Sequence, residues 1–154
     1  MSQVLADSAL AEAAARDASG ASGAPVGPLH GVPMVIKEEI DVAGCVTTFG
    51  GLANSAPAEA DSEVVRRLRA AGAVIVGKTQ MPEFGSFPLH RTRSLRLHAE
   101  PLELGMSPGG SSGGTAVAVA TGMAVAGSAA MAAARSAFLP HALVSLGSSQ
   151  RGAA

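Results

Sequence analysis

Aromatic residues are scarce in this 154-residue chain, which contains four phenylalanines and neither tryptophan nor tyrosine. Hydrophobic residues still make up 47% of the sequence, and alanine supplies much of that fraction. Because alanine buries little apolar area, we expect a hydrophobic core that stabilises the fold only weakly. The length is that of one ordinary domain.

Cysteine is almost absent, since Cys45 is the single one. An intramolecular disulfide is therefore excluded, and this composition fits a reducing compartment. Small thiols are more often buried than reactive, so Cys45 is a poor candidate for a nucleophile.

The chain also has little net charge and no long apolar run. A net charge of -1 and an isoelectric point near 6.4 argue against general electrostatic binding to nucleic acid or membrane surfaces. No basic segment followed by an apolar one opens the sequence, and glycines interrupt its most apolar part. We therefore expect a soluble, cytoplasmic protein with no membrane or nucleic-acid partner; the oligomeric state is not predicted.

The first third of the chain predicts a helix, a loop and a strand. Residues 4–18 are rich in alanine and acidic residues and favour a helix, which should end in the Gly/Ser/Pro-rich loop that follows. Residues 32–40 (VPMVIKEEI) predict a short buried strand that carries Lys37 near its end. Residues 41–57 have the composition of irregular surface chain.

The most regular pattern lies at residues 60–84 (ADSEVVRRLRAAGAVIVGKTQMPEF). Asp61 or Ser62 is suited to cap a helix whose stop signal is Gly72, and residues 73–76 then predict a fully buried strand. A helix, a glycine and a β-branched strand in this order indicate an α/β fold with a mixed or parallel sheet.

Residues 72–79 (GAVIVGKT) also match the phosphate-binding pattern G-x-x-x-x-G-K-[ST]. In a nucleotide-binding module, Lys78 would contact a phosphate and Thr79 a magnesium ion. A phosphate loop, however, follows a strand and precedes a helix, whereas here the four variable residues predict the strand itself and Pro82 follows closely. Nucleotide binding is therefore kept only as the alternative function.

Two serines lie between pairs of glycines in residues 107–116 (SPGGSSGGTA). Such a stretch is often a flexible linker, and a glycine-rich turn before a helix also exposes backbone N–H groups to an anion. Residues 115–120 that follow are apolar and compatible with a helix. The serines are therefore expected at a helix N-terminus, a position that favours a functional role over a linker.

A serine needs a base to accept its proton before it attacks a carbonyl group. In a Ser-His-Asp arrangement the base is a histidine that is oriented by an aspartate. The histidines here are His30, His90, His98 and His141, and none has an aspartate at a spacing that suggests this arrangement. A lysine serves as the base where burial or neighbouring cations lower its pKa. Lys37, on an apolar strand, is the candidate; the alternative is a structural lysine whose amine reaches solvent.

Three stretches in this order strongly resemble the amidase signature family: GPLHGVPMVIKEEIDVAG, EADSEVVRRLRAAGAVIVGKTQMPEFG and SPGGSSGGTAVAVATGM. Together they cover about half of the chain. Members of this family are serine hydrolases that cleave carboxamides through a Ser-Ser-Lys triad. The resemblance implies a mixed sheet flanked by helices, a small-molecule amide substrate, and neither cofactor nor metal. It also identifies GAVIVGKT as the family's ordinary buried strand.

The resemblance implies a role for each matched residue. Lys37 corresponds to the buried general base, and Ser111 to the bridging serine that relays a proton between this lysine and the nucleophile. The family has a cis peptide before that serine, which Gly109 and Gly110 would permit. Ser112 corresponds to a supporting serine.

The family's nucleophile lies downstream, in a segment similar to Asp-Gly-Gly-Gly-Ser-Ile-Arg-Ile-Pro whose glycine N–H groups form the oxyanion hole. This chain has no such segment. The family spacing counted from Ser111 falls at Ala134 or Arg135, and neither side chain is a nucleophile.

Codons can be chosen for which the missing segment lies in another reading frame. Residues 130–140, back-translated with permitted codons and read from the third letter, give Asp-Gly-Gly-Gly-Ser-Ile-Arg-Ile-Pro. Residues 89–104, read from the second letter, give an aromatic-rich segment with Asn-Pro-Trp, which resembles the family text before its glycine-serine loop. We therefore hypothesise that residues 89–104 and about 129–154 are out of frame.

Residues 1–154 are thus predicted to be a truncated amidase domain with an incomplete fold. As written, the chain has the base and the bridging serine but lacks the nucleophile, and we expect it to be inactive. A non-functional remnant that folds poorly is the remaining hypothesis, because half a sheet leaves edges exposed.

Overall fold

A computed structural model describes residues 1–52, 54–85, 110–129 and 143–144. The atypical segment 89–104 lies outside these ranges, as do Gly109, Ala134 and Arg135, and only residues 129, 143 and 144 of the segment at about 129–154 are described. Among the described helices, none has the length and apolar character needed to cross a membrane.

The described residues form one five-stranded mixed sheet with the strand order β1-β3-β2-β4-β5. The central strands β3, β2 and β4 are parallel, whereas the outer strands β1 and β5 are antiparallel to their neighbours. The strand bounds are β1 Gln3–Val4, β2 Pro33–Lys37, β3 Val74–Thr79, β4 Ala126–Ser128 and β5 Leu143–Val144.

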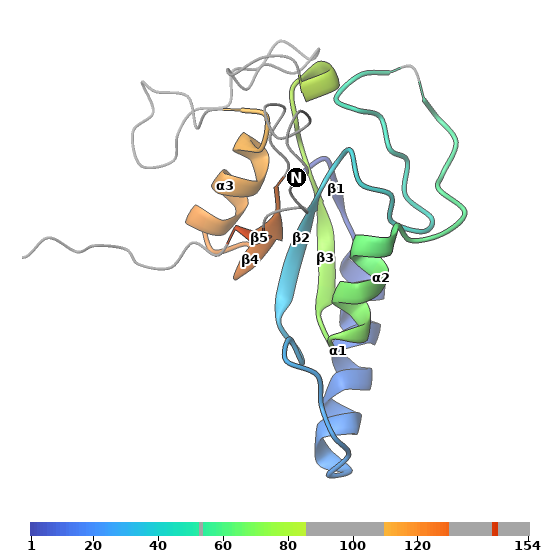
Figure 1. Cartoon of the computed structure of the whole chain (residues 1–154), viewed down its shortest axis with the longest axis vertical. Coiled ribbons are helices and arrows are strands. Elements are labelled where there is room, and N and C mark those ends of the chain that lie inside the picture. Colours follow the sequence, from blue (N-terminus) through green and yellow to red (C-terminus); the bar gives the residue numbers. More distant parts are fainter. Residues whose placement is uncertain (53, 86–109, 130–142, 145–154) are drawn as a thin grey trace, which may run out of the picture.

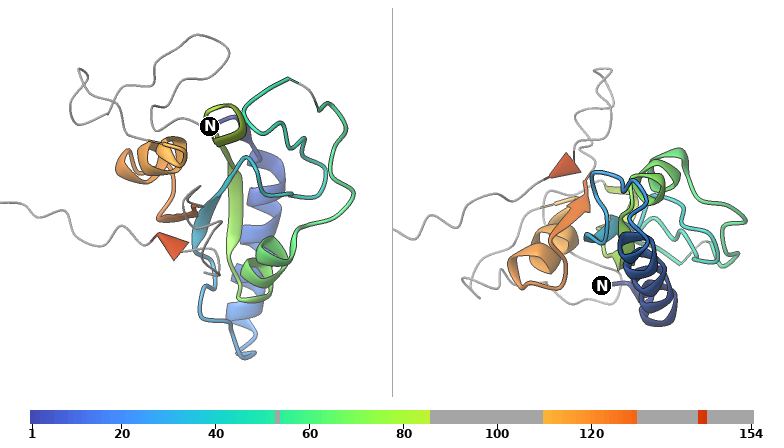
Figure 2. Two further views of the ribbon diagram at one scale, coloured as in Figure 1. Left: turned by 45° about the horizontal axis from the view of Figure 1, so that its top comes forward. Right: turned by 90° about the horizontal axis from the view of Figure 1, so that it is seen from below.

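Helices cover both faces of this sheet (Figure 1). Helices α1 (Ala6–Ala21) and α2 (Glu63–Ala70) lie on one side of β2 and β3, and α3 (Gly113–Ala120) lies on the other. Figure 2 shows the same separation from two further directions. A short 3₁₀ turn, η1 (Glu83–Gly85), follows β3. This arrangement confirms the predicted α/β fold with a mixed sheet flanked by helices.

Most element boundaries follow the local signals of the sequence. Ser62 is the N-cap of α2, and its side chain accepts a hydrogen bond from the backbone N–H of Val65, as the capping pattern predicts. The helix predicted over residues 4–18 begins and ends later in the structure, because Val4 belongs to β1 and α1 continues through Gly20 to Ala21. One glycine costs a helix only about 1 kcal/mol, which the other residues of α1 offset.

The central strands differ from the prediction in their length. Strand β2 ends at Lys37, and a turn follows in which the N–H of Ile40 donates to the Lys37 carbonyl. Strand β3 continues beyond the predicted end at Val76 to Thr79, because its pairing with β2 continues.

Strand β3 contains a bulge that reverses which side chains face α3. Met34 pairs with Ile75, and Val35 pairs with Gly77, so Val76 is an extra residue without a partner in β2. Side chains alternate along a strand, and an extra residue shifts this alternation for everything that follows. As a result Thr79 pairs with Lys37 and faces α3, whereas Lys78 faces the opposite side.

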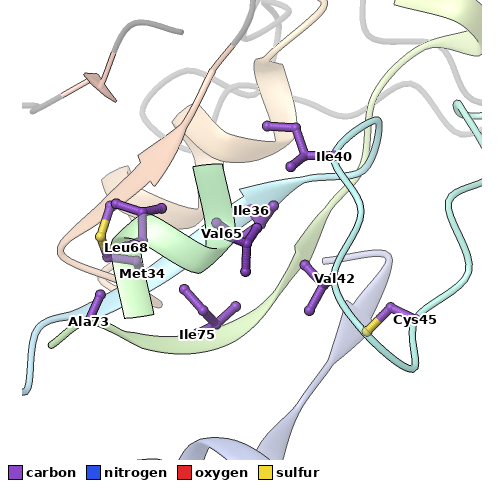
Figure 3. Close-up of a cluster of buried hydrophobic side chains, with 9 residues drawn as sticks. All are labelled: Met34, Ile36, Ile40, Val42, Cys45, Val65, Leu68, Ala73 and Ile75. Atoms are coloured by element: carbon purple, nitrogen blue, oxygen red, sulfur yellow. The ribbon is translucent and has the colours of Figure 1, made fainter. Parts of the chain in front are cut away.

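The main hydrophobic core lies between the sheet and α2 (Figure 3). Its buried members come from β2, the segment after β2, α2, the turn after α2 and β3: Met34, Ile36, Ile40, Val42, Cys45, Val65, Leu68, Ala73 and Ile75. A smaller cluster of Val35, Ala118 and Ala124 packs between the sheet and α3. Aliphatic side chains and small residues thus form both clusters, in agreement with the scarcity of aromatic residues.

The segment 41–57 is irregular, as predicted, but it is not simply surface chain. Val42 and Cys45 are fully buried in the main core, and Thr47 is buried beside them. The fully buried amine of Lys78 donates hydrogen bonds to the Val46 carbonyl and to Thr47 Oγ1, at 3.2 and 2.8 Å. Lys78 therefore attaches this segment to β3.

Candidate active site

Lys37 and Ser111 meet where the end of β2 approaches the start of α3. Lys37 Nζ donates a hydrogen bond to Ser111 Oγ at 2.6 Å, across 74 residues of sequence. Lys37 is fully buried, and Ser111 retains 9% of its surface exposed. The structure thus brings together the two residues predicted as base and bridging serine, and it excludes the alternative of a lysine whose amine reaches solvent.

The alternation of side chains along β2 directs Lys37 toward α3. Met34 and Ile36 point into the main core beside α2, so Val35 and Lys37 point to the opposite face, where α3 lies. Glu39, on the turn after β2, places its Oε1 atom 3.3 Å from Lys37 Nζ in a salt bridge that the sequence analysis did not anticipate. The turn after β2 thus places a carboxylate beside the Lys37 amine.

The first turn of α3 holds Ser111 over the end of the sheet. Ser111 follows a cis peptide bond from Gly110, as the family resemblance implies, and directly precedes the N-cap residue Ser112. A β-carbon on Gly114 would lie 2.3 Å from the backbone oxygen of Gln80. The glycine is therefore required for α3 to approach the end of β3 closely enough for Ser111 to reach Lys37.

A buried chain of hydroxyl groups connects α3 to three strands beneath the site. Thr79 Oγ1 and Thr115 Oγ1 are 2.7 Å apart, and Thr115 Oγ1 donates to the Ser128 carbonyl at 3.1 Å. Ser128 Oγ in turn accepts the backbone N–H of Lys37 at 2.8 Å. The chain thus connects the helix that bears Ser111 to the backbone of Lys37.

Sequence reasoning missed these hydroxyl residues. Thr79 was considered only as a possible magnesium ligand of the phosphate-loop pattern, and Thr115 only as the start of a helix. The sequence did contain one signal: both threonines lie in otherwise apolar segments. A hydroxyl group that is buried in such a segment needs a hydrogen-bond partner.

Replacing Thr115 with valine is expected to weaken the anchoring of α3. Valine keeps the shape of threonine but removes the hydroxyl group, so the Ser128 carbonyl and Thr79 lose a buried partner, at a cost of about 1–3 kcal/mol. Urea denaturation measures the change in the free energy of unfolding. Thr115→Ser, which retains the hydroxyl group, should recover most of it; equal losses in the two variants would contradict a role for the hydrogen bonds.

The remaining predicted site residues occupy distinct positions. Gly110 forms the cis peptide bond with Ser111, and Ser112 is the N-cap residue of α3 although its side chain makes no capping hydrogen bond. Gly109, Ala134 and Arg135 fall outside the described residues. Among the described residues, no group of His, Cys, Asp and Glu side chains is arranged to hold a metal ion.

The phosphate-loop interpretation disagrees with the geometry. Val74 to Thr79 form the strand β3 itself, rather than a loop that wraps around phosphates. Burial lowers the pKa of Lys78, and its amine hydrogen-bonds within the fold instead of reaching a ligand. Burial also raises the pKa of the nearby Cys45 thiol, which disfavours the reactive thiolate.

The described arrangement has the elements of serine activation. A buried amine within hydrogen-bond distance of a hydroxyl group accepts its proton when the amine is neutral. The N–H groups of the first turn of α3 point toward the same end of the sheet, where they favour negative charge. This combination suits acyl transfer, in which a hydroxyl oxygen attacks a carbonyl carbon and negative charge develops on the carbonyl oxygen.

Comparison with known proteins identifies the family of this chain. The family model described as Amidase matches residues 1–130. The chain is 50% identical over 119 residues to the putative amidase AmiA2 of Mycobacterium bovis, a match that covers 77% of this chain and 24% of that protein.

Solved structures agree with the sequence relatives. The native peptide amidase from Stenotrophomonas maltophilia superimposes with a TM-score of 0.70 at 39% identity, covering 78% of this chain and 26% of that one. A chain from the inhibitor-bound form of a vestigial protein complex, connected with the origins of an s-triazine catabolic enzyme, superimposes with a TM-score of 0.78 at 34% identity. The match covers 82% of this chain and 28% of that one. The present chain thus spans about a quarter of the length of the relatives it matches.

Proposed function

Because the chain belongs to the amidase family, we propose that its function is the hydrolysis of carboxamides. The acyl group passes to a serine and then to water, and ammonia or an amine leaves. The 2.6 Å contact between Lys37 Nζ and Ser111 Oγ is the observation that carries this proposal. A cytoplasmic location, a small-molecule amide as substrate and the absence of a cofactor belong to the same proposal.

In this mechanism Lys37 is the general base and Ser111 the bridging serine. Lys37 takes the hydroxyl proton of Ser111, and Ser111 takes the proton of the attacking serine, so that the nucleophile is activated through the bridge. Protons return along the same route to the leaving amine. Gly109 and Gly110 permit the backbone turn before Ser111, and Ser112 supports it.

The nucleophile is the missing part of the site, and we attribute its absence to a shift of reading frame. The family match ends at residue 130, and the second shift is proposed to begin between Val125 and Ala130. Beyond that residue the shifted reading supplies a serine at the boundary between Ala134 and Arg135. A corresponding shift over residues 89–104 supplies the aromatic segment that precedes the glycine-serine loop in the family.

The coding DNA and an activity assay together test this function. The coding DNA is to be sequenced across residues 87–105 and downstream of residue 125. When its reading frame is shifted by one letter, it is expected to encode both family segments. The protein encoded by the corrected frame should release ammonia or amine from simple carboxamides, whereas the 154-residue chain should not. Hydrolysis by the uncorrected chain that depends on Lys37 would show that its nucleophile lies elsewhere.

A further inference from the structure

We propose that Ser111 of the 154-residue chain is itself an acyl acceptor, which Lys37 activates toward activated esters such as aryl esters. This goes beyond the proposed function, in which Ser111 only relays a proton to another serine. The proposal assigns a covalent modification site to a chain that lacks the family's nucleophile segment.

The geometry of the pair meets the first requirement of a serine-lysine dyad. A nucleophile and its base need to lie within about 2.6–3.2 Å of each other, and Lys37 Nζ lies 2.6 Å from Ser111 Oγ. Serine-lysine pairs activate serine in hydrolases of several unrelated folds. No second serine is needed for this step, since Lys37 contacts Ser111 directly.

Access to the hydroxyl group is the second requirement. Ser111 retains 9% of its surface exposed, whereas Lys37 is fully buried. Gly85 of η1 lies beside Ser111, and a β-carbon at this position would be 3.4 Å from Ser111 Oγ. A side chain at residue 85 would therefore pack against the Ser111 hydroxyl group, and glycine adds no such contact.

Charge stabilisation is the third requirement, and α3 contributes to it. Ser111 lies directly before the N-cap of an eight-residue helix whose first-turn N–H groups and dipole favour negative charge. The carbonyl oxygen of an ester attacked by Ser111 Oγ gains negative charge at this end of the helix. Such donors lower the barrier of acyl transfer most when they are fixed before the reaction begins.

The proposed step is balanced without another reactant. Ser111 Oγ forms a bond to the acyl carbon, its proton passes to Lys37 Nζ, and the bond from the acyl carbon to the aryl oxygen breaks. The phenolate leaves with the electron pair. An amide would need a proton donated to its leaving nitrogen, whereas a nitrophenolate leaves without one, so the dyad alone suffices for the activated ester.

The experiment incubates the folded 154-residue chain with p-nitrophenyl acetate. Release of nitrophenolate is followed in time, and peptide mass spectrometry locates the acetyl group. We expect at most one acetyl group per chain on Ser111. Lys37→Met and Lys37→Arg should lower the labelling rate of Ser111 by about 10²- to 10⁴-fold, the range that general-base catalysis provides. Arginine keeps the positive charge but does not accept the proton.

Two matched controls separate the dyad from general reactivity. Lys78→Met removes the chain's other lysine, which is equally buried but faces the opposite side of the sheet, and Ser19→Ala removes an exposed serine of α1. Both should leave labelling of Ser111 unchanged, with circular dichroism verifying the fold of every variant.

Several results would overturn the proposal. Acetyl groups only on other residues, labelling of Ser111 that is unchanged in both Lys37 variants, or a folded chain that stays unlabelled would each do so. The outcome is independent of the proposed function: if the frame-corrected protein hydrolyses amides while this chain is not acetylated at Ser111, amidase function stands and the dyad fails. If Ser111 is acetylated but the corrected protein does not hydrolyse amides, the dyad stands and the amidase function fails.

Discussion

Amide hydrolysis by the frame-corrected protein is expected to fall by about 10²- to 10⁴-fold when Lys37 is replaced by alanine. The substitution removes the amine that lies 2.6 Å from Ser111 Oγ. The loss should appear in kcat more than in KM, because the amine acts on a proton that moves in the transition state. Steady-state kinetics on a simple carboxamide measures both parameters.

Lys37→Arg is the matched variant for this measurement. It retains a long cationic side chain beside Glu39 but provides no neutral amine at accessible pH, so its kcat should fall by a similar factor. If Lys37→Arg instead kept most of the activity, Lys37 would have an electrostatic role and another group would be the base.

Replacing Gly114 with alanine is expected to destabilise the fold by about 3 kcal/mol, the upper end of the usual cost of overpacking. The new β-carbon would lie 2.3 Å from the backbone oxygen and 2.9 Å from the backbone nitrogen of Gln80. Neither atom is part of a flexible side chain, so α3 as a whole has to move away from β3. Urea denaturation followed by circular dichroism measures the loss.

The sign of the change in the free energy of unfolding distinguishes the clash with Gln80 from an effect of helix propensity. Alanine favours a helix interior over glycine by about 1 kcal/mol, so propensity alone would make Gly114→Ala stabilising. Ala120→Gly, at the exposed end of the same helix, provides the reference for propensity without a clash. A gain in stability for Gly114→Ala would mean that α3 does not pack against Gln80 as described.

The sequence predicted those parts of the fold that depend on local signals. The cap at Ser62, the β-branched strand before Gly77 and the helix after the serines each follow from residues within one turn or one strand. The family resemblance then paired Lys37 with Ser111, which 74 residues of sequence separate. Periodicity and composition alone gave no information about that pairing.

The parts that were missed depend on contacts between distant segments. The bulge at Val76 arises from the register between β2 and β3, and a single strand read alone does not reveal it. The same holds for the hydroxyl chain through Thr115 and Ser128, whose partners belong to different elements. The salt bridge between Glu39 and Lys37 was also missed, because it forms only when a turn follows β2. The sequence had predicted that the strand continues to residue 40.

The bulge at Val76 also makes the chain convenient for spectroscopy. The sequence has two lysines, and the shift in alternation places their amines on opposite sides of the sheet. A sample labelled with ¹⁵N only at lysine would therefore contain one side-chain nitrogen that reports on Ser111 and α3 and another that reports on the segment around Thr47. Removal of the extra residue in β3 would reverse the facing of Lys78, so that both signals would report on the same side.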